Sequence, residues 1–274
     1  AAMGNLGGVL GSDNVSVSGA AVFASANVAL DGNGDVTTQA IQRGTVGLSG
    51  TDAGNYSLSW TNGSGKIKQA TLTVHANNET KFVTRADPTF TARYSGFVNG
   101  ETEATAGLTG TLEVTRSNSG PDHDPTNLKN LVGTYTNAIT ASGLSANNYS
   151  IRYTPGNFTI VGAGQLLVRA AGTSDYGTSA TYSITSVSYW DLTANSGAGG
   201  EVVLTGVTAN SNNQFTINDG VGGKATFTLV ALNPQTSTSA RLRAGTYQLG
   251  ASGTVTENSN NFSNMIVVTG THLV

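Results

Sequence analysis

Residues 143–153 read GLSANNYSIRY, and closely related wording occurs at two other places, GTDAGNYSLSW at 50–60 and VTENSNNFSNMIVV at 255–268. Each copy has a turn rich in small and amide residues, then an aromatic residue, then a run in which apolar and polar side chains alternate. Alternation with a period of two is typical of a strand with one buried face. The repeated stretch therefore predicts three similar strands along one chain.

The aromatic residue of each copy is expected to open a strand by entering the core. The Asn before it is expected to serve the turn, with a side chain that mimics a backbone hydrogen bond. In the first copy Leu58 and Trp60 are in phase with the aromatic residue, so Trp60 is predicted to be a core residue. The aromatics are Tyr56, Tyr149 and Phe262, and the preceding residues are Asn55, Asn148 and Asn261.

The composition of the 274-residue chain indicates an all-β protein. Thr, Val, Tyr and Ile favour strands, Gly and Asn favour turns, and no apolar pattern with helical spacing continues for three turns. Charged residues make up 11% of the chain and basic residues are isolated, so we expect no binding of nucleic acid. No run of 18 apolar residues occurs, so we expect no membrane insertion, and the lack of Cys excludes disulfides.

Similar stretches divide the chain into three segments, 1–68, 69–161 and 162–274. The second and third align in order, PTFTARYSGFV with ATYSITSVSYW and VGTYTNAITASGLSANNYSIRY with AGTYQLGASGTVTENSNNFSNMIV. A repeat of about 90 to 110 residues is long enough for a domain with its own core and far longer than a solenoid coil. The linkers GKIKQA and VGAGQ are short, so we expect tandem small β-domains in an elongated, semi-rigid array.

The middle segment resembles the glycine-rich β-repeat known as the MBG domain. The resemblance is carried by LTVHANNETKFVTRADPTFTARYSGFVNGET and VGTYTNAITASGLSANNYSIRYTPGNFTI. The first segment is similar to the later part of the related YDG-type repeat, through DNVSVSGAAVFA and GLSGTDAGNYSL. The third resembles a divergent MBG repeat, which keeps SDYG and AGTY but has SVSYWDLTANSGAGG at 186–200 where YSGFVNGETEATAG would fall.

Such repeats occur in large bacterial exoproteins similar to filamentous haemagglutinins, which are exported by two-partner secretion. The resemblance therefore implies a secreted or cell-surface location and a non-enzymatic role as a stalk or spacer in a biofilm or cell-adhesion protein. Its partners would be a host or matrix polysaccharide or another adhesin molecule. An alternative is a glycan- or matrix-binding module that acts through the divergent third repeat.

Two loops contain groups that could hold a metal ion. In LDGNGDVTT, the residues Asp31, Asn33 and Asp35 occupy alternate positions as in a calcium loop, but Val36 and Gln42 stand where Gly and a bidentate Glu are needed. A hairpin turn is therefore the preferred interpretation. In SGPDHDPTNLKN at 119–130, His123 lies between Asp122 and Asp124, and a solvated loop is preferred. We predict no metal site, no cofactor and no catalytic residues.

Other charged and polar side chains are expected to be exposed to solvent rather than to form a functional site. Glu101 and Glu103 are expected on one face of a strand as solubility charges. Lys66 and Lys81 are expected near strand ends or turns with exposed side chains, which disfavours a Lys–Asn cross-link. His75 is expected to face outward, since it alternates with apolar neighbours.

The candidate ligand-binding residues are Tyr189, Trp190 and Asp191, in the divergent part of the third repeat. Aromatic faces stack on sugar rings, and an adjacent acid accepts hydrogen bonds from hydroxyls. The preferred alternative is that one ring packs in the core while its neighbour covers an edge, because neighbouring side chains on a strand point in opposite directions.

Overall fold

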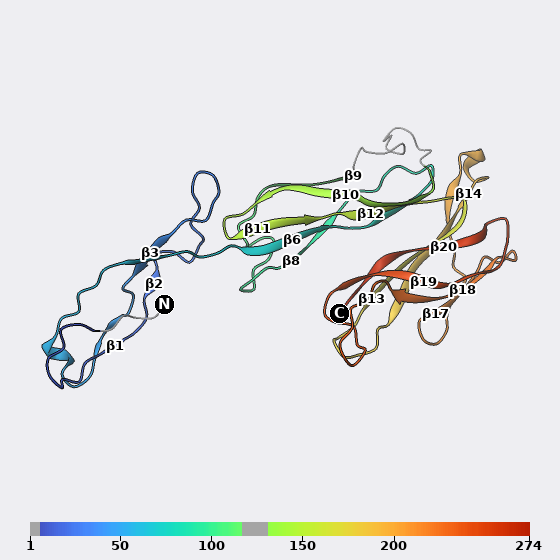
Figure 1. Cartoon of the computed structure of the whole chain (residues 1–274). Coiled ribbons are helices and arrows are strands. Elements are labelled where there is room, and N and C mark those ends of the chain that lie inside the picture. Colours follow the sequence, from blue (N-terminus) through green and yellow to red (C-terminus); the bar gives the residue numbers. More distant parts are fainter. Residues whose placement is uncertain (1–5, 117–130) are drawn as a thin grey trace. The chain divides into compact units, whose positions relative to one another are not determined.

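The computed structural model describes residues 6–116 and 131–274, without the side chains of Ser263 and Asn264. Throughout these residues the regular elements are strands, apart from two short 3-10 turns, η1 (Ala53–Asn55) and η2 (Asn195–Gly197). The chain is all-β, as the composition predicted (Figure 1). No helix among the described residues has the length and apolar character needed to cross a bilayer.

The chain forms two compact units, and the boundary between them passes through the middle segment. One unit contains residues 1–74, 94–113 and 142–153, and the other contains residues 75–93, 114–141 and 154–274. The boundary falls within strands, because β6, β9 and β10 contribute residues to both units. The three segments predicted from sequence remain a prediction about domain organisation.

The first segment has short strands joined by irregular connections. One sheet has the order β1-β4 and the other β2-β3-β5. The strands are β1 (Ser16–Ser18), β2 (Val22–Phe23), β3 (Gln39–Gln42), β4 (Gly47–Ser49) and β5 (Gly63–Gly65). Residues 56–60 are not a strand, although their exposure alternates as predicted, with Tyr56, Leu58 and Trp60 half-buried. The alternating sequence accounts for the alternating exposure of these side chains, but no described strand pairs with residues 56–60.

The middle segment has two sheets, with the orders β7-β12-β10-β9 and β11-β6-β8. Apolar side chains alternate along its strands; in β6, Leu72 and Val74 are fully buried while Thr73 and His75 are half-buried. Its strands are β6 (Ala70–Ala76), β7 (Glu79–Phe82), β8 (Ala92–Ser95), β9 (Thr109–Arg116), β10 (Gly133–Ser145), β11 (Tyr149–Thr154) and β12 (Gly156–Val161).

The third segment has eight strands in the order β15-β14-β13-β20-β19-β18-β17-β16 (Figure 1). Its core contains Phe215, Phe227, Leu229 and Phe262. The strands are β13 (Gly164–Thr173), β14 (Tyr182–Asp191), β15 (Gly200–Val203), β16 (Val207–Ala209), β17 (Gln214–Asn218), β18 (Lys224–Ala231), β19 (Thr246–Glu257) and β20 (Phe262–Leu273).

The second and third segments share one strand arrangement. In the third, the last strand β20 lies between β19 and the first strand β13, and β13 also pairs with β14. In the middle segment, β12 lies between β10 and β7, while β11 pairs with β6, which also pairs with β8. The last strand of each segment has a parallel partner: β12 pairs with β7, the second strand of the middle segment, and β20 pairs with β13, the first strand of the third. The sequence alignment of the two segments therefore corresponds to a similar pairing of their last strands.

Candidate functional site

The hydroxyl of the repeated tyrosine closes a turn in the middle segment. Tyr149 opens β11 and is 2% exposed. Its hydroxyl accepts a hydrogen bond from the Val98 N–H at 3.1 Å and donates one to the Glu101 carboxylate. The Glu101 N–H in turn donates to the Val98 carbonyl at 3.0 Å. Tyr149 therefore enters the core as predicted, and its hydroxyl also ties down a four-residue turn.

The same arrangement occurs in the first segment. The hydroxyl of Tyr56 accepts from the Leu10 N–H at 3.0 Å and donates to the Asp13 carboxylate at 2.7 Å, and the Asp13 N–H donates to the Leu10 carbonyl. We call this arrangement the tyrosine-closed turn. In both copies an apolar residue supplies the backbone N–H and carbonyl groups. An acid three residues later accepts a hydrogen bond from the tyrosine hydroxyl. The sequence signal for this turn is an apolar residue followed three positions later by an acid, in LGSD at 10–13 and VNGE at 98–101. The alternation of apolar and polar residues does not reveal it.

The third copy of the repeated stretch is different. Phe262 opens β20 and is fully buried, as predicted, but it has no hydroxyl. The loop nearby is held instead by Asp219, whose carboxylate accepts from Ser259 Oγ at 2.6 Å and Asn261 Nδ2 at 2.9 Å. Burial would raise the pKa of Asp219, but these hydrogen bonds and two from backbone N–H groups outweigh it and lower the pKa.

In the second and third copies, the Asn before the aromatic residue does more than close its own turn. The Asn148 side chain accepts from the Val28 N–H at 2.9 Å and donates to Asn27 Oδ1 at 3.0 Å. It therefore ties the middle segment to the first, which the local interpretation did not foresee. The Asn261 side chain donates to Asp219, which is also distant in sequence.

The two predicted solubility charges lie in a loop rather than on a strand, so that prediction was wrong. Glu101 accepts from Tyr149, and Glu103 Oε1 accepts from the Tyr94 hydroxyl at 2.9 Å. Burial and the hydrogen bond to Glu103 raise the pKa of Tyr94 to about 12. Both carboxylates serve as acceptors for tyrosine hydroxyls.

Lys81 is buried, contrary to the prediction of an exposed side chain. Its Nζ lies 2.6 Å from the Asp87 carboxylate, and Arg116 Nε lies 3.4 Å from the other oxygen of the same group. The Arg116 guanidinium also lies 4.6 Å from the centre of the Phe158 ring. The ADP turn returns Asp87 toward β7, and Arg116 of β9 is the distant member of this cluster. Lys66 is exposed as predicted, and its Nζ donates to the Val36 carbonyl.

The possible calcium loop is a hairpin turn. Asp31 Oδ1 accepts from the N–H groups of Asn33 and Asp35, both at 2.9 Å, and these backbone hydrogen bonds lower the pKa of Asp31. Leu30 and Val36 form the bridge that closes the hairpin. The 119–130 loop with His123 lies outside the described residues. Within the described part of the chain, no three His, Asp or Glu side chains gather as a metal site would require.

The candidate ligand residues lie at the end of β14, where both faces of the strand are covered. Tyr189 is 7% and Trp190 5% exposed. The Trp190 ring packs on Phe82, with ring centres 5.7 Å apart, and joins a core with Val161 and Leu167. Neither ring presents a free face for a sugar to stack on.

The third candidate, Asp191, is used by the turn that follows β14. Its carboxylate accepts from the Thr193 N–H at 2.8 Å and from Thr193 Oγ1 at 2.7 Å. The side-chain hydrogen bond from Thr193, followed by the backbone one, lowers the pKa of Asp191. Both rings are buried, whereas the preferred interpretation placed one ring in the core and its neighbour over an edge.

The two histidines among the described residues, His75 and His272, have separate surroundings. His75 is half-buried and its Nδ1 lies 2.7 Å from Thr154 Oγ1. His272 is fully buried in β20, with Nε2 2.9 Å from Ser174 Oγ and its ring set edge-on against Tyr182. Burial lowers the pKa of His272, so the neutral imidazole is favoured in the folded state.

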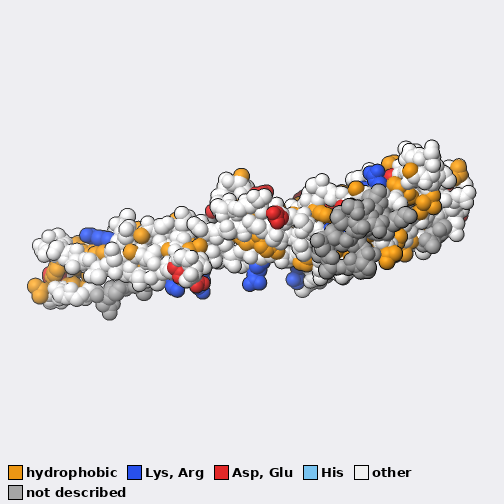
Figure 2. Space-filling view, turned by 90° about the horizontal axis from the view of Figure 1, so that it is seen from above, with side chains coloured by type: hydrophobic (Ala, Val, Ile, Leu, Met, Phe, Trp, Pro, Cys, Tyr) orange, Lys and Arg blue, Asp and Glu red, His pale blue; other side chains and the backbone are white. Residues whose placement is uncertain are grey.

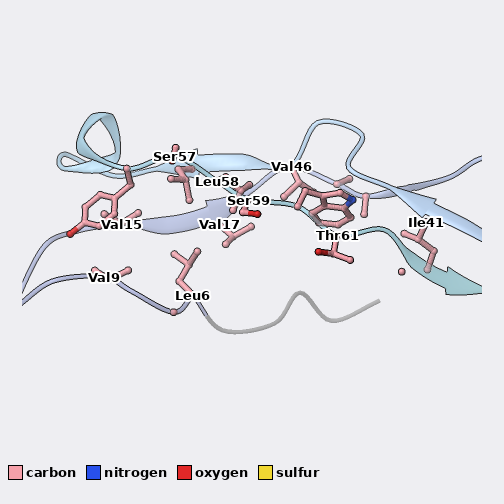
Figure 3. A pocket seen from close by; sticks show the side chains of 18 of the residues that line it. Leu6, Val9, Val15, Val17, Ile41, Val46, Ser57, Leu58, Ser59 and Thr61 are labelled. Carbon is pink, nitrogen blue, oxygen red and sulfur yellow. The ribbon is translucent and has the colours of Figure 1, made fainter.

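An open apolar pocket of about 810 Å³ lies within the first segment (Figure 3). Val15, Val17 and Leu58 contribute to it from neighbouring segments, and Trp60 lines it rather than being enclosed in a core. The indole Nε1 of Trp60 donates to Asn62 Oδ1 at 2.9 Å. None of the described residues that line this pocket is charged, so its walls offer mainly apolar contact. The prediction of Trp60 as a core residue was therefore wrong.

Comparison with known proteins identifies the middle of the chain. The family model "MBG domain (YGX type)" matches residues 72–159. No curated protein and no solved structure matches the chain. The matched range begins in β6 and ends in β12, so it takes in both sheets of the middle segment and the tyrosine-closed turn of Tyr149. Residues 72–159 of this chain are thus similar to the MBG domain of the YGX type.

Proposed function

We propose that the chain is a non-enzymatic stalk or spacer in a secreted bacterial adhesin. The observation that carries this proposal is the parallel pairing of β13 with β20, the first and last strands of the third segment. The pairing extends from Gly164↔Phe262 to Thr173↔Leu273. When first and last strands are parallel, the chain enters at one end of the sheet and leaves at the other, so each module adds its strand length to the array. Ten residues of strand span roughly 33 Å.

The same pairing suits a segment that carries tension. A pull on the two ends of such a module acts along the strands, so the hydrogen bonds between β13 and β20 are loaded together rather than one after another. The β7–β12 pair gives the middle segment a parallel contact of the same kind, from Phe158↔Glu79 to Val161↔Phe82. A spacer between a cell and its attachment point needs this property.

The surface and the family are consistent with this role. Figure 2 shows few charged side chains, scattered among uncharged ones on the face in view. Because the middle of the chain resembles repeats of large exported adhesins, we place the chain in the biofilm matrix or at the cell surface. Its proposed partners are a polysaccharide or another adhesin molecule. Stacking of a glycan on Tyr189 and Trp190 is not favoured, because both rings are buried.

Single-molecule pulling tests the mechanical part of the proposal. The chain has no Cys, so introduced pairs give specific handles. Handles at Gln165→Cys and Leu273→Cys load β13 and β20 lengthwise. Handles at Thr246→Cys and Leu273→Cys load the antiparallel β19–β20 pair from one end, because Thr246 is the partner of Leu273.

The first pair of handles is expected to require a clearly higher unfolding force than the second. The second pair is a matched control, since both tests use the same folded chain and share one handle. Equal forces would show that the parallel strands form no mechanical clamp and would count against a tension-bearing spacer.

A further inference from the structure

A second pocket, of about 620 Å³, lies where the loop after β7 meets the end of β14 and the start of β15. The residues that matter here are Thr84, Arg85, Asp87, Arg169, Trp190 and Glu201, with Gly199 at the pocket wall. All of them belong to the same compact unit. A volume of this size lies within the range of pockets that hold small ligands.

Two hydrogen-bonding groups of this pocket have no partner among the described residues. They are the indole Nε1 of Trp190 and the hydroxyl Oγ1 of Thr84, and both atoms are buried. A buried donor without a partner costs free energy, so native structures rarely keep one without a reason. Both residues line the same pocket, so one acceptor bound there is the simplest partner for the two groups.

The backbone at Thr84 is strained. Its φ is 73°, a left-handed conformation that is unfavourable for a β-branched residue. Such strain is found where the surrounding structure fixes a residue for a purpose. Here it coincides with the unpartnered hydroxyl of the same residue.

Gly199 leaves space beside the indole N–H. A Cβ placed on Gly199 would lie 2.4 Å from Trp190 Nε1, too close for any real contact. Every other residue at this position would therefore crowd the N–H. Gly197, two residues earlier, also has a positive φ, but its Cβ would meet nothing within 4 Å.

The charges around the pocket favour an anion by a small margin. Lys81, Arg85 and Arg169 line it together with Asp87 and Glu201. Arg116 adds a further cation, since it shares Asp87 with Lys81. Glu79 interacts electrostatically with Arg169, and its negative charge offsets part of this excess of positive charge. Among the described residues one positive charge remains, which suits a ligand that carries a single negative charge.

We propose that this pocket binds a uronate residue of an acidic polysaccharide, with its carboxylate accepting hydrogen bonds from Trp190 Nε1–H and Thr84 Oγ1–H. A carboxylate accepts only and has two oxygens, which matches two donors. The exposed Arg85 supplies the balancing charge. The pocket is larger than a carboxylate needs, and its polar wall leaves room for a hydroxylated ring. Trp190 contributes its N–H edge, so this differs from sugar stacking on its face, and it is independent of the spacer role.

Nitrogen-15 NMR of the whole chain tests the site. The protein has two tryptophans, so it gives two indole N–H signals, and Trp60, bonded to Asn62, is an internal control. Titration with tri-galacturonate is expected to move the Trp190 signal downfield in a saturable way and to leave Trp60 unchanged. The methyl ester of the same trisaccharide is expected to leave both signals unchanged.

Matched variants locate the contact. Thr84→Val keeps the shape and removes the hydroxyl, and it is expected to raise the Kd for tri-galacturonate at least fivefold. Gly199→Ala is expected to abolish the Trp190 shift. Gly197→Ala, which has the same backbone strain without the crowding, is expected to retain it.

Three outcomes would overturn the proposal. One is a Trp190 signal that does not respond to tri-galacturonate at tens of millimolar on the wild-type chain. The second is an equal response to the methyl ester or to sulfate, which would deny selectivity for a carboxylate. The third is tighter binding of a glutamate-rich peptide than of tri-galacturonate, which would assign the pocket to an acidic peptide.

Discussion

Tyr149 combines burial and a hydrogen-bonded hydroxyl in one side chain. Its ring lies edge-on against Phe97 with ring centres 6.0 Å apart, and it packs in a core with Leu72 and Ala106. Its hydroxyl closes the Val98–Glu101 turn. The ring explains why an aromatic residue recurs in the repeated stretch, and the hydroxyl explains why two of the three copies have Tyr.

Shortening Tyr149 separates these two contributions. Tyr149→Ala is expected to lower the free energy of unfolding by about 3–5 kcal/mol, because it leaves a cavity. Tyr149→Phe keeps the ring and is expected to cost about 1–2 kcal/mol, because the Val98 N–H and Glu101 lose their partner. Urea denaturation of the variants checks both values. An equal loss of unfolding free energy in the two variants would contradict separate contributions of the ring and the hydroxyl. Tyr56→Ala, which removes a half-buried ring, should lower the free energy of unfolding less than Tyr149→Ala.

His272 makes stability depend on pH. Its pKa is lowered by burial, so at a pH between the folded and unfolded pKa values the unfolded chain binds a proton that the folded chain does not bind. Its contribution is fully present above the ordinary histidine pKa of about 6.5 and is lost as the pH falls from there toward the folded pKa. The urea midpoint should therefore decrease between pH 7.5 and pH 5.5. In His272→Gln this decrease should be smaller, whatever the variant's stability at pH 7.5; an unchanged decrease would rule His272 out as its source.

At the scale of elements, two glycines support the alignment of the second and third segments. Gly143 in β10 and Gly253 in β19 are the SG glycines of the aligned stretches, and both have positive φ, 96° and 140°. A Cβ on Gly143 would lie 2.1 Å from the Thr111 carbonyl oxygen, and one on Gly253 would lie 2.5 Å from that of Thr226. Glycine thus lets β10 and β19 each approach a neighbouring strand closely.

Gly143→Ala is expected to be strongly destabilising, because it adds a backbone clash to the strain of a left-handed conformation, which alone costs about 1–2 kcal/mol. Gly100→Ala is the control, since its φ is 74° and its Cβ would meet nothing within 4 Å. Thermal melting of the two variants measures the difference. Similar melting temperatures would mean that the β9–β10 approach yields easily to the added methyl group.

The sequence predicted the elements whose cause is local and missed those whose cause is distant. Strands at β6, β11 and β20 follow from alternation, and the Asp31 hairpin follows from its turn residues. Residues 56–60 alternate equally well, but strand pairing depends on a neighbour that alternation does not specify. The charge cluster that buries Lys81 includes Arg116 as well as Asp87, and the role of Asn148 depends on Asn27 and Val28, so neither could be predicted from adjacent residues.

At the scale of the whole molecule, the two faces of β13 belong to two cores. Leu166 and Val168 pack with the core of the third segment, whereas Leu167 packs with Phe82 and Val161 of the middle segment. This accounts for the unbroken apolar run LLV, since a strand covered on both faces has no polar side. Within this unit, the junction between two repeats is a packed core rather than a free linker, which is what a semi-rigid spacer requires.

Small-angle X-ray scattering of the 274-residue chain tests the spacer proposal most directly. A compact domain of this length would have a radius of gyration of about 19 Å. The proposal predicts a value well above this and a distance distribution with a long tail, because modules whose first and last strands are parallel add end to end. A radius near 19 Å with a symmetrical distance distribution would show that the modules fold back on one another and would contradict the proposal.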